Sequence, residues 1–557
     1  MAKLMLTEEE RAIVDIVNPE KSEKKLPEKL PVDFIVNNRI CYLLYEKMGE
    51  ELESKYGHEK LERVRKKAEN MQFSTDEVYK LAEHFKNNDI NYVFVFKGVT
   101  SQCDSSDADV VIEKEQDKET RNLLEKLGYI HITTWGSGNV YVKSEDVKAV
   151  QIELRYEDSY AYKYPFYGVI KILSNKREVK GINMPYPADE LVELAFKLVS
   201  SRRSIKLSDI IHLSSLLKEC DVDYIRTNIK KGLFVPFLHF IYIVNTIYKE
   251  LYNKDIASPL VSIANELHNK SKILRLISRI ETRKLRLPFY SRILTNSCIR
   301  YKLSYDIKHF RFKEFIEDMR YFFYNKISHN YIPFVKSVLT IKGIIVCFSG
   351  IDGTGKTTHA TKLVERFKNM AIPCQYAYCI FEPKISYPFM ALVYLIKGYR
   401  RKDYYKSRIL RKIWNYIIIL DFLYIYFTKV KIPLLIGKSV ICDRYVYDWI
   451  AALKYDGLYN ERASKILLKI IPKPDLVFIL DISEEVSNVR KDDTKDAVNI
   501  KDSDSAMDYL SIHRRSFLEI AQSLNIPVID ATRDFKELNE EFYKNIIRVY
   551  LNMNKRK

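Results

Sequence analysis

Glycine and proline are scarce in this chain, with 16 and 17 residues among 557. This composition excludes collagen-like sequence and the glycine- and proline-rich segments of low complexity. The eight cysteines are scattered and form no CxxC pair, so the sequence predicts neither a zinc site nor a disulfide framework. These absences indicate a reduced, cytoplasmic globular protein, and the length corresponds to about three or four domains.

Long apolar segments are also missing. The N-terminal residues lack the apolar stretch of a signal peptide. Residues 233–248 and 413–428 come nearest to membrane length, but both are shorter than the roughly 20 residues that a transmembrane helix needs. The second segment also carries Asp421 at its centre. We therefore predict two buried core helices and no transmembrane segment.

Basic residues exceed acidic ones, 91 to 73, which gives a net charge of +18. Such an excess favours polyanionic partners such as nucleotides, nucleic acid or an acidic membrane surface. Residues 270–326 are the most basic part of the chain, with fifteen Lys or Arg and five Asp or Glu. This segment is a candidate for binding nucleic acid or anionic lipid. Its interleaved apolar residues equally fit an amphipathic helix that packs on a neighbour, and we favour that role.

The apolar pattern changes along the chain and predicts four segments. Residues 1–74 have the pattern of helices, and residues 221–340 form a basic, mostly helical region without a recognisable motif. Residues 75–220 mix helices and strands, which predicts an α+β domain. The expected elements are a helix over 77–87, strands over 92–96, 108–112, 140–142 and 150–154, a polar loop over 98–106, a helix over 120–127 and helical structure over 188–220.

Residues 341–557 predict an α/β domain. Apolar strands alternate with helices there, which is typical of a parallel sheet flanked by helices. The expected strands cover 344–348, 439–442, 476–480 and 527–529, with a short one near 374–379.

The first of these strands leads into a phosphate-loop motif. The residues from Gly350 to Thr357 fit GxxxxGK[ST] and stand between the apolar strand and a helix predicted over 359–369. Glycines let the backbone N–H groups converge on a phosphate, and the helix N-terminus adds its positive dipole end. Lys356 is expected to reach the β- and γ-phosphates, and the Thr357 hydroxyl to bind Mg²⁺. The predicted ATP-binding residues are Gly350, Ile351, Asp352, Gly353, Thr354, Gly355, Lys356, Thr357 and Thr358.

A second set of polar residues follows the strand predicted over 439–442. Asp443, Arg444 and Tyr445 stand at its carboxyl end, where parallel sheets bind their ligands. We expect Asp443 to organise the water shell of the metal. Arg444 is expected to grip an acceptor phosphate with two parallel hydrogen bonds.

These motifs resemble the thymidylate kinases, a family of P-loop nucleoside monophosphate kinases. The resemblance covers 341–557 and includes the phosphate loop, Asp443 to Tyr445, and Lys473-Pro-Asp-Leu-Val-Phe-Ile-Leu-Asp481. It implies that Asp352 contacts the acceptor's sugar hydroxyl, that Arg444 and Tyr445 belong to the acceptor site, and that Arg490 belongs to the lid over ATP. Where the family has Arg-Glu-Pro-Gly, this chain has Phe-Glu-Pro-Lys384, which lacks the arginine.

The resemblance implies an enzyme that transfers phosphate from ATP, with Mg²⁺, to a nucleoside monophosphate, with dTMP as the first choice. Lys356, Asp443, Arg444 and Arg490 are then the catalytic candidates. Family members are usually dimers, so the apolar segment 413–436 is a candidate for homodimer formation.

Three carboxylates of the first half form a separate candidate metal site. Asp107 and Asp109 share one side of a predicted strand, and Glu153 on another strand is placed to complete a site for one or two Mg²⁺ ions. Residues 75–220 also resemble nucleotidyltransferases of the polymerase-β-like superfamily, through Phe96-Lys-Gly98, Ser106-Asp-Ala-Asp109 and Glu153. The family's Gly-Gly or Gly-Ser is Gly98-Val99 in this chain.

Two other functions remain open at this stage. In one, the first half transfers a nucleotidyl group and the phosphate-loop domain serves as an ATP-binding regulator. In the other, both halves bind nucleotide without catalysis and regulate a partner.

Overall fold

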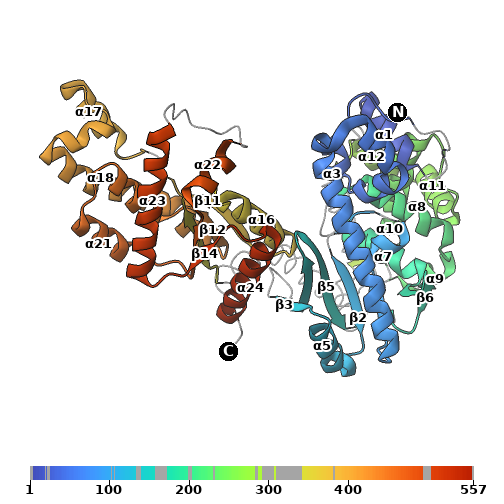
Figure 1. The fold of residues 1–557 in the computed structure, drawn as a ribbon. Helices are drawn as coiled ribbons and strands as arrows, with labels where there is room; N and C mark the ends of the chain where they lie inside the picture. Colours follow the sequence, from blue (N-terminus) through green and yellow to red (C-terminus); the bar gives the residue numbers. More distant parts are fainter. Residues whose placement is uncertain are drawn as a thin grey trace. The chain divides into compact units, whose positions relative to one another are not determined.

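The structure is a computed structural model of the chain. It describes residues 4–18, 21, 25–101, 103–105, 107–132, 139–156, 172–198, 204–229, 232–282, 286–290, 307–308, 342–380, 383–492 and 503–554. Two compact units make up the chain (Figure 1). The N-terminal unit holds residues 1–131, 137–143 and 148–331, and the C-terminal unit holds 132–136, 144–147 and 332–557. The division into four segments stays a prediction.

The N-terminal unit begins with three helices, α1 (Glu8–Val17), α2 (Val32–Asn37) and α3 (Cys41–Asn87). α3 is interrupted by non-helical backbone at Met48 and at Gly57, whose φ of 73° suits glycine. The helix predicted over 77–87 is the last part of α3, which packs along β5.

A five-stranded mixed sheet follows, in the order β1-β2-β5-β4-β3. β1 runs antiparallel to β2, and β2 runs parallel to β5. The four predicted strands are present as β1, β2, β4 and β5, whereas β3 and the short helix α4 within the expected loop were not predicted. The bounds are β1 Tyr92–Val95, α4 Lys97–Ser101, β2 Ala108–Ile112, β3 Ile130–Ile132, β4 Val140–Glu145 and β5 Lys148–Tyr156.

The rest of this unit is mostly helical. The helical structure predicted over 188–220 is present as α7 and α8, and the two-residue strand β8 between them was not predicted. The remaining elements are α5 (Asp117–Lys126), β6 (Lys176–Val179), β7 (Ile182–Pro185), α7 (Pro187–Lys197), β8 (Ser204–Ile205), α8 (Leu207–Glu219), α9 (Val222–Asn228), α10 (Phe234–Tyr252), α11 (Pro259–Lys270), α12 (Lys272–Glu281) and β9 (Phe289–Tyr290).

α10 confirms the core helix predicted over 233–248, because most of its apolar side chains are buried. Among the helices that the structure describes, none is long and apolar enough to cross a membrane. Most of the basic segment 270–326 lies outside the described residues, so its binding role stays a prediction.

The C-terminal unit is an α/β domain, as predicted. Its five strands are all parallel, in the order β11-β12-β10-β13-β14. Strand bounds are β10 Ile345–Gly350, β11 Cys374–Tyr378, β12 Ser439–Asp443, β13 Leu476–Asp481 and β14 Val528–Asp530. The helices are α16 Lys356–Asn369, α17 Tyr387–Lys397, α18 Arg408–Ile425, α19 Ile432–Leu435, α20 Val446–Tyr455, α21 Glu461–Ile470, α22 Glu484–Asp492, α23 Ser503–Leu524 and α24 Phe535–Asn554. Short helical turns lie at η3 (Arg401–Lys406) and η4 (Tyr426–Lys431).

The core helix predicted over 413–428 is present as α18, but it is buried on one side only. One face of α18 is buried, with Trp414 and Phe422 in the core, but its opposite face is exposed. Exposed apolar side chains recur there at intervals of three or four residues and continue into η4. They form a stripe, named here the α18 stripe: Ile409, Ile413, Tyr416, Leu420 and Tyr424 of α18, and Phe427 of η4. Residues at these intervals share one helix face.

Candidate active site

The loop between β10 and α16 contains glycines at positions where a side chain would strain the backbone or clash with a neighbour. Gly350 has a φ of 145°, and a Cβ at this position would lie 2.3 Å from the carbonyl oxygen of Leu480. Gly355 has a φ of 85° and directly precedes Lys356, the first residue of α16. The helix thus starts inside the motif, three residues earlier than predicted. The N–H groups in the first turn of a helix have no partner within the helix, so they are available to a phosphate.

Lys356 lies within this loop and is only 4% exposed. Its ammonium donates to the carbonyl oxygens of Gly350 at 2.9 Å and Ile351 at 2.6 Å. Burial, reinforced by the nearby positive charge of Arg444, lowers the pKa of Lys356 to about 8. The positive charge of Lys356 is therefore only partly balanced by the negative groups around it, and a bound phosphate would supply the missing negative charge.

Asp443 lies next to the phosphate loop because β12 pairs with β10, in a register that places Asp443 opposite Phe348. Its Oδ2 accepts hydrogen bonds from the Thr357 hydroxyl at 2.6 Å and from the Tyr376 hydroxyl at 2.7 Å. Its Oδ1 is buried and has no hydrogen-bond partner among the described residues. A carboxylate oxygen and a threonine hydroxyl side by side fit the ligands that Mg²⁺ prefers.

Arg444 follows in the left-handed backbone region, with a φ of 69°, which is uncommon for a residue with a side chain. Its guanidinium donates to Asp352 Oδ1 at 2.6 Å and to Asp448 Oδ1 at 3.4 Å. Its Nε is buried and lacks a hydrogen-bond partner within the part of the chain that the structure describes. The structure thus brings Asp352, Asp443 and Arg444 to the loop that holds Lys356.

Asp448 is a polar site residue that sequence reasoning missed. Its carboxylate accepts from the Ser349 hydroxyl at 2.6 Å and from the Tyr445 backbone N–H at 3.1 Å. Burial raises the pKa of Asp448, while Arg444 and Lys356 oppose this shift. The sequence did offer one signal for Asp448, because it is the third residue of α20 and an acid at that position caps the start of a helix.

A pocket with aromatic walls opens beside Arg444 and Asp448. It is lined by Ile380, Trp414, Ile418, Arg444, Asp448, Trp449, Ala452, Leu453, Asp456, Tyr509, His513 and Phe517. A planar base packs well against aromatic rings, and the Arg444 cation lies at the same pocket. Tyr445 does not line this pocket. It is fully buried and donates its hydroxyl to the carbonyl oxygen of Pro472, and its role in the acceptor site stays a prediction.

Arg490, on α22, contacts the phosphate loop from the other side. Its Nη1 donates to the carbonyl oxygens of Gly353 at 3.4 Å and Ala531 at 3.2 Å. The segment after Asp492, which carries the rest of the predicted lid, lies outside the described residues. Arg490 is therefore adjacent to the loop, and its role over ATP stays a prediction.

The three carboxylates of the N-terminal unit lie together. Ligand atoms of Asp107, Asp109 and Glu153 lie within 4.8 Å of one another, because Asp109 stands opposite Glu153 in the parallel β2–β5 pair. Arg155 bridges the cluster, with Nε 2.8 Å from Asp109 Oδ1 and Nη2 2.5 Å from Glu153 Oε1. The cluster thus combines metal-type ligands with a guanidinium.

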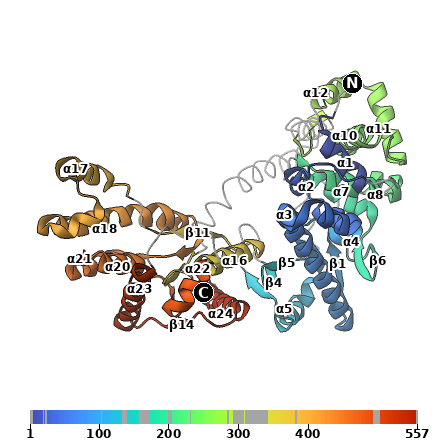
Figure 2. The same cartoon turned by 45° about the horizontal axis from the view of Figure 1, so that its top comes forward.

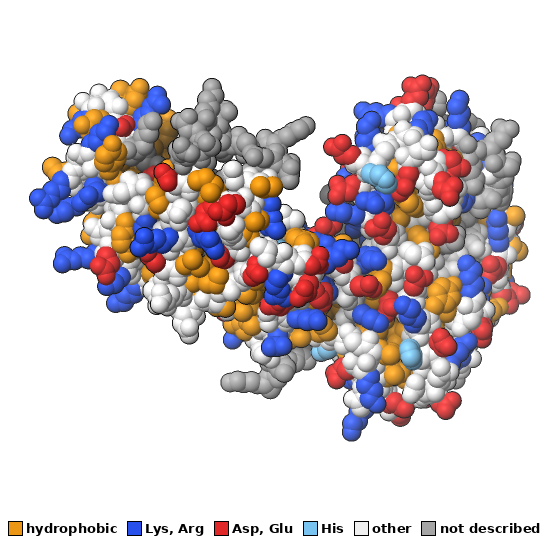
Figure 3. Space-filling model, in the orientation of Figure 1, with side chains coloured by type: hydrophobic (Ala, Val, Ile, Leu, Met, Phe, Trp, Pro, Cys, Tyr) orange, Lys and Arg blue, Asp and Glu red, His pale blue; other side chains and the backbone are white. Residues whose placement is uncertain are grey.

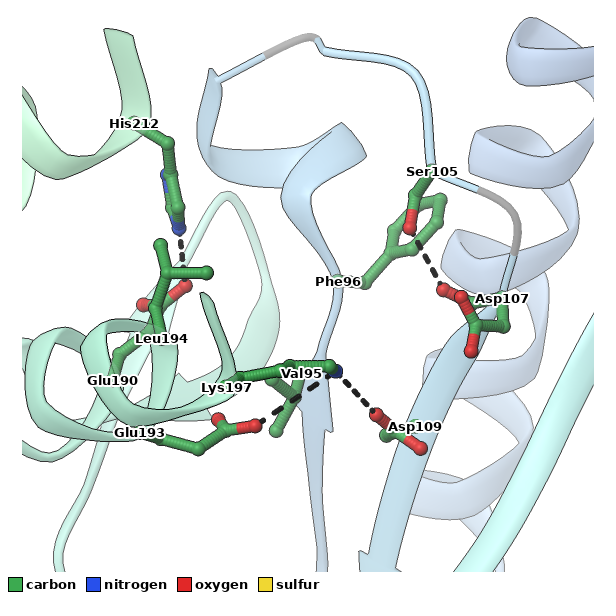
Figure 4. A pocket seen from close by; sticks show the side chains of 10 residues that line it. All are labelled: Val95, Phe96, Ser105, Asp107, Asp109, Glu190, Glu193, Leu194, Lys197 and His212. Carbon is green, nitrogen blue, oxygen red and sulfur yellow. Dashed lines mark hydrogen bonds and ion pairs between the residues drawn. The ribbon is translucent and has the colours of Figure 1, made fainter. Parts of the chain in front are cut away.

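The two aspartates line a pocket between β2 and the helices α7 and α8 (Figure 4). Lys197 reaches across it, 3.5 Å from Asp109 Oδ2 and 3.9 Å from Glu193 Oε1. On the far wall His212 Nε2 lies 2.8 Å from Glu190 Oε1. Sequence reasoning found the aspartates and missed these facing residues, which come from helices distant in the chain.

Comparison with known proteins agrees with the C-terminal site. Residues 348–542 match the family model described as thymidylate kinase. A probable thymidylate kinase of Methanocaldococcus jannaschii is 28% identical over 207 residues, which cover 37% of this chain and 95% of the relative.

Two further relatives agree with this match. A thymidylate kinase of Wolbachia pipientis is 29% identical over 217 residues, 37% of this chain and 95% of the relative. A probable thymidylate kinase of Archaeoglobus fulgidus is 33% identical over 121 residues, 21% of this chain and 58% of the relative. The C-terminal region of the chain therefore contains a domain that matches the thymidylate kinase family.

Proposed function

We propose that the C-terminal unit transfers the γ-phosphoryl group of ATP to a nucleoside monophosphate, with dTMP as the first candidate. The observation that carries this proposal is the meeting of Lys356, Asp443 and Arg444 at the carboxyl ends of β10 and β12, beside an aromatic pocket. The family match of residues 348–542 supports it.

Each side chain has a distinct role in this reaction. Lys356 and the loop N–H groups hold the β- and γ-phosphates, and Thr357 with Asp443 would hold Mg²⁺. When bound, Mg²⁺ neutralises charge on the phosphates. Arg444 orients the acceptor phosphate, and the Asp352 carboxylate beside it is placed to accept a hydrogen bond from the sugar hydroxyl.

The test is a screen of nucleoside monophosphates with ATP and purified full-length protein, read as ADP release and as the diphosphate product. We expect dTMP to give the fastest turnover. A preference for another monophosphate would replace dTMP as acceptor, whereas no turnover with any of them would overturn the kinase proposal.

Nucleotide binding should take up a proton above pH 8. The pKa of Lys356 is about 8 in the free site, and phosphate beside the ammonium raises it, so the complex holds more protons than the free protein. Affinity for ATP should therefore fall by up to about tenfold per pH unit above 8. Calorimetry at pH 8.5 in two buffers of different ionisation enthalpy measures the uptake. Lys356→Arg is the control, since arginine stays charged and should show none.

A second candidate function is nucleotidyl transfer by the N-terminal unit. The proximity of Asp107, Asp109 and Glu153 supports it, since three carboxylates can hold divalent ions that align a nucleophile with an α-phosphate. The test is transfer of label from α-³²P nucleoside triphosphates to a macromolecule. Asp109→Asn should abolish this transfer and leave dTMP phosphorylation unchanged. ATP binding without either activity would favour the regulatory role.

We also propose that the α18 stripe forms a homodimer contact. Apolar residues spaced three and four apart are the pattern with which two helices pack against each other. Leu420→Glu combined with Tyr424→Glu should therefore lower the mass measured by light scattering from two chains to one. Ile466→Glu with Ile470→Glu, two exposed isoleucines of α21, is the control. A wild-type protein with the mass of one chain would contradict this proposal.

A further inference from the structure

The helix α17 is apolar on nearly every side, yet the C-terminal unit covers little of it. Val393 is its only buried residue. Leu395 is 81% and Ile396 is 70% exposed, and Tyr387, Leu392 and Tyr394 are exposed as well. A helix that is apolar all round is normally enclosed by other apolar groups. We name these five exposed residues the α17 face.

Hydrogen bonds hold both ends of α17 in a defined position. At its start, the buried carboxylate of Asp421 on α18 accepts hydrogen bonds from three backbone N–H groups, those of Lys384, Ile385 and Ser386, at 3.0, 2.7 and 3.1 Å. At its end, Gly398 adopts a φ of 67° and donates to the carbonyl oxygen of Tyr394. Figures 1 and 2 show α17 at the far end of its unit, away from the sheet. The α17 face therefore lies outside the phosphate-transfer site.

The residues around α17 are strongly basic. Between Lys384 and Lys412 the sequence holds nine basic residues, Lys384, Lys397, Arg400, Arg401, Lys402, Lys406, Arg408, Arg411 and Lys412, and one acidic residue, Asp403. Lys397, Arg400 and Arg408 are exposed. Figure 3 shows apolar and basic side chains together at this end of the unit. An exposed apolar helix bordered by positive charge fits a partner whose outer layer is anionic and whose layer beneath is apolar.

We propose that α17 inserts into the surface of an anionic lipid bilayer. A lipid surface accounts for both features of α17, since its apolar layer covers the exposed apolar side chains and its anionic headgroups attract each Lys and Arg near the surface. At 11 residues α17 is about 16 Å long, half of what a bilayer core requires, so it lies in the interface. Its tyrosines suit the interface because each has an apolar ring and a polar hydroxyl group.

The experiment is flotation of the full-length protein with vesicles. Phosphatidylcholine vesicles with about one-third phosphatidylglycerol should bind the protein, and pure phosphatidylcholine vesicles should bind at least about tenfold less. Leu395→Glu combined with Ile396→Glu should lower binding about tenfold or more, because it places two charges in the apolar layer. Lys397→Glu with Arg400→Glu should weaken binding, and high salt should weaken wild-type binding.

The control is Ile466→Glu with Ile470→Glu, which makes the same change on α21 and should bind as wild type. Light scattering of each variant in the absence of lipid records whether its mass changes. Absence of wild-type binding to the anionic vesicles overturns the proposal, as does equal binding by the Leu395→Glu, Ile396→Glu protein. If wild type does not bind the vesicles and the mass of the Leu395→Glu, Ile396→Glu variant falls from two chains to one, then α17 contacts a second copy of the chain instead of lipid.

Discussion

Replacing Lys356 by methionine should lower the kcat for phosphorylation of the acceptor at least about a hundredfold. In the proposed reaction the ammonium is the cation that the loop presents to the β- and γ-phosphates, and its stabilisation of the migrating charge would be lost with it. Methionine keeps the length of the side chain and removes the charge. Rates measured with saturating ATP and acceptor report this loss directly.

The same change should shift the melting temperature by only a few degrees. Burial of the ammonium costs free energy, as the lowered pKa of Lys356 shows, whereas its hydrogen bonds to Gly350 and Ile351 stabilise the fold. Methionine removes both effects, which oppose each other. Lys368→Met, an exposed lysine in the last turn of α16, is the matched control and should keep full activity. A Lys356→Met protein that keeps wild-type turnover would refute the assigned role.

The fold of the C-terminal unit was predictable because its signals are local. The central strands β10, β12 and β13 are short, mostly buried apolar runs next to helical patterns, and the glycines of the phosphate loop fix their own conformation. The contact between Asp443 and Thr357 follows from the same topology, since parallel strands end at one edge. These predictions did not require knowledge of how helices pack.

The features that were missed depend on packing between distant segments. The segments 233–248 and 413–428 look alike in composition, yet α10 is enclosed while α18 leaves a stripe exposed. Only the spacing of apolar residues in α18 indicates the difference. Tyr376 contacts Asp443 because β11 pairs with β12, and no short sequence motif predicts that pairing. Lys197 and Arg155 face Asp109 for the same kind of reason.

The Arg444→Met substitution should lower kcat/KM for the acceptor at least about 30-fold, with little change in the KM for ATP. In the proposed reaction the guanidinium is the cation that meets the acceptor phosphate, and loss of a buried charged hydrogen bond costs about 2 kcal/mol or more. Steady-state kinetics with each substrate varied in turn measure the two effects. Arg514→Met is the matched control, since Arg514 pairs with Asp481 and Glu484 and does not line the pocket with aromatic walls.

Arg444 also compensates Asp448, so this variant should be less stable as well as less active. Without the guanidinium the buried Asp448 carboxylate loses its ion-pair partner, which should destabilise the fold by several kcal/mol, on the order of what breaking a buried ion pair costs. Adding Asp448→Asn removes the uncompensated charge and should restore the melting temperature. It should not restore turnover, because no cation then meets the acceptor phosphate. Recovery of acceptor turnover in the double variant would show that Arg444 serves the fold alone.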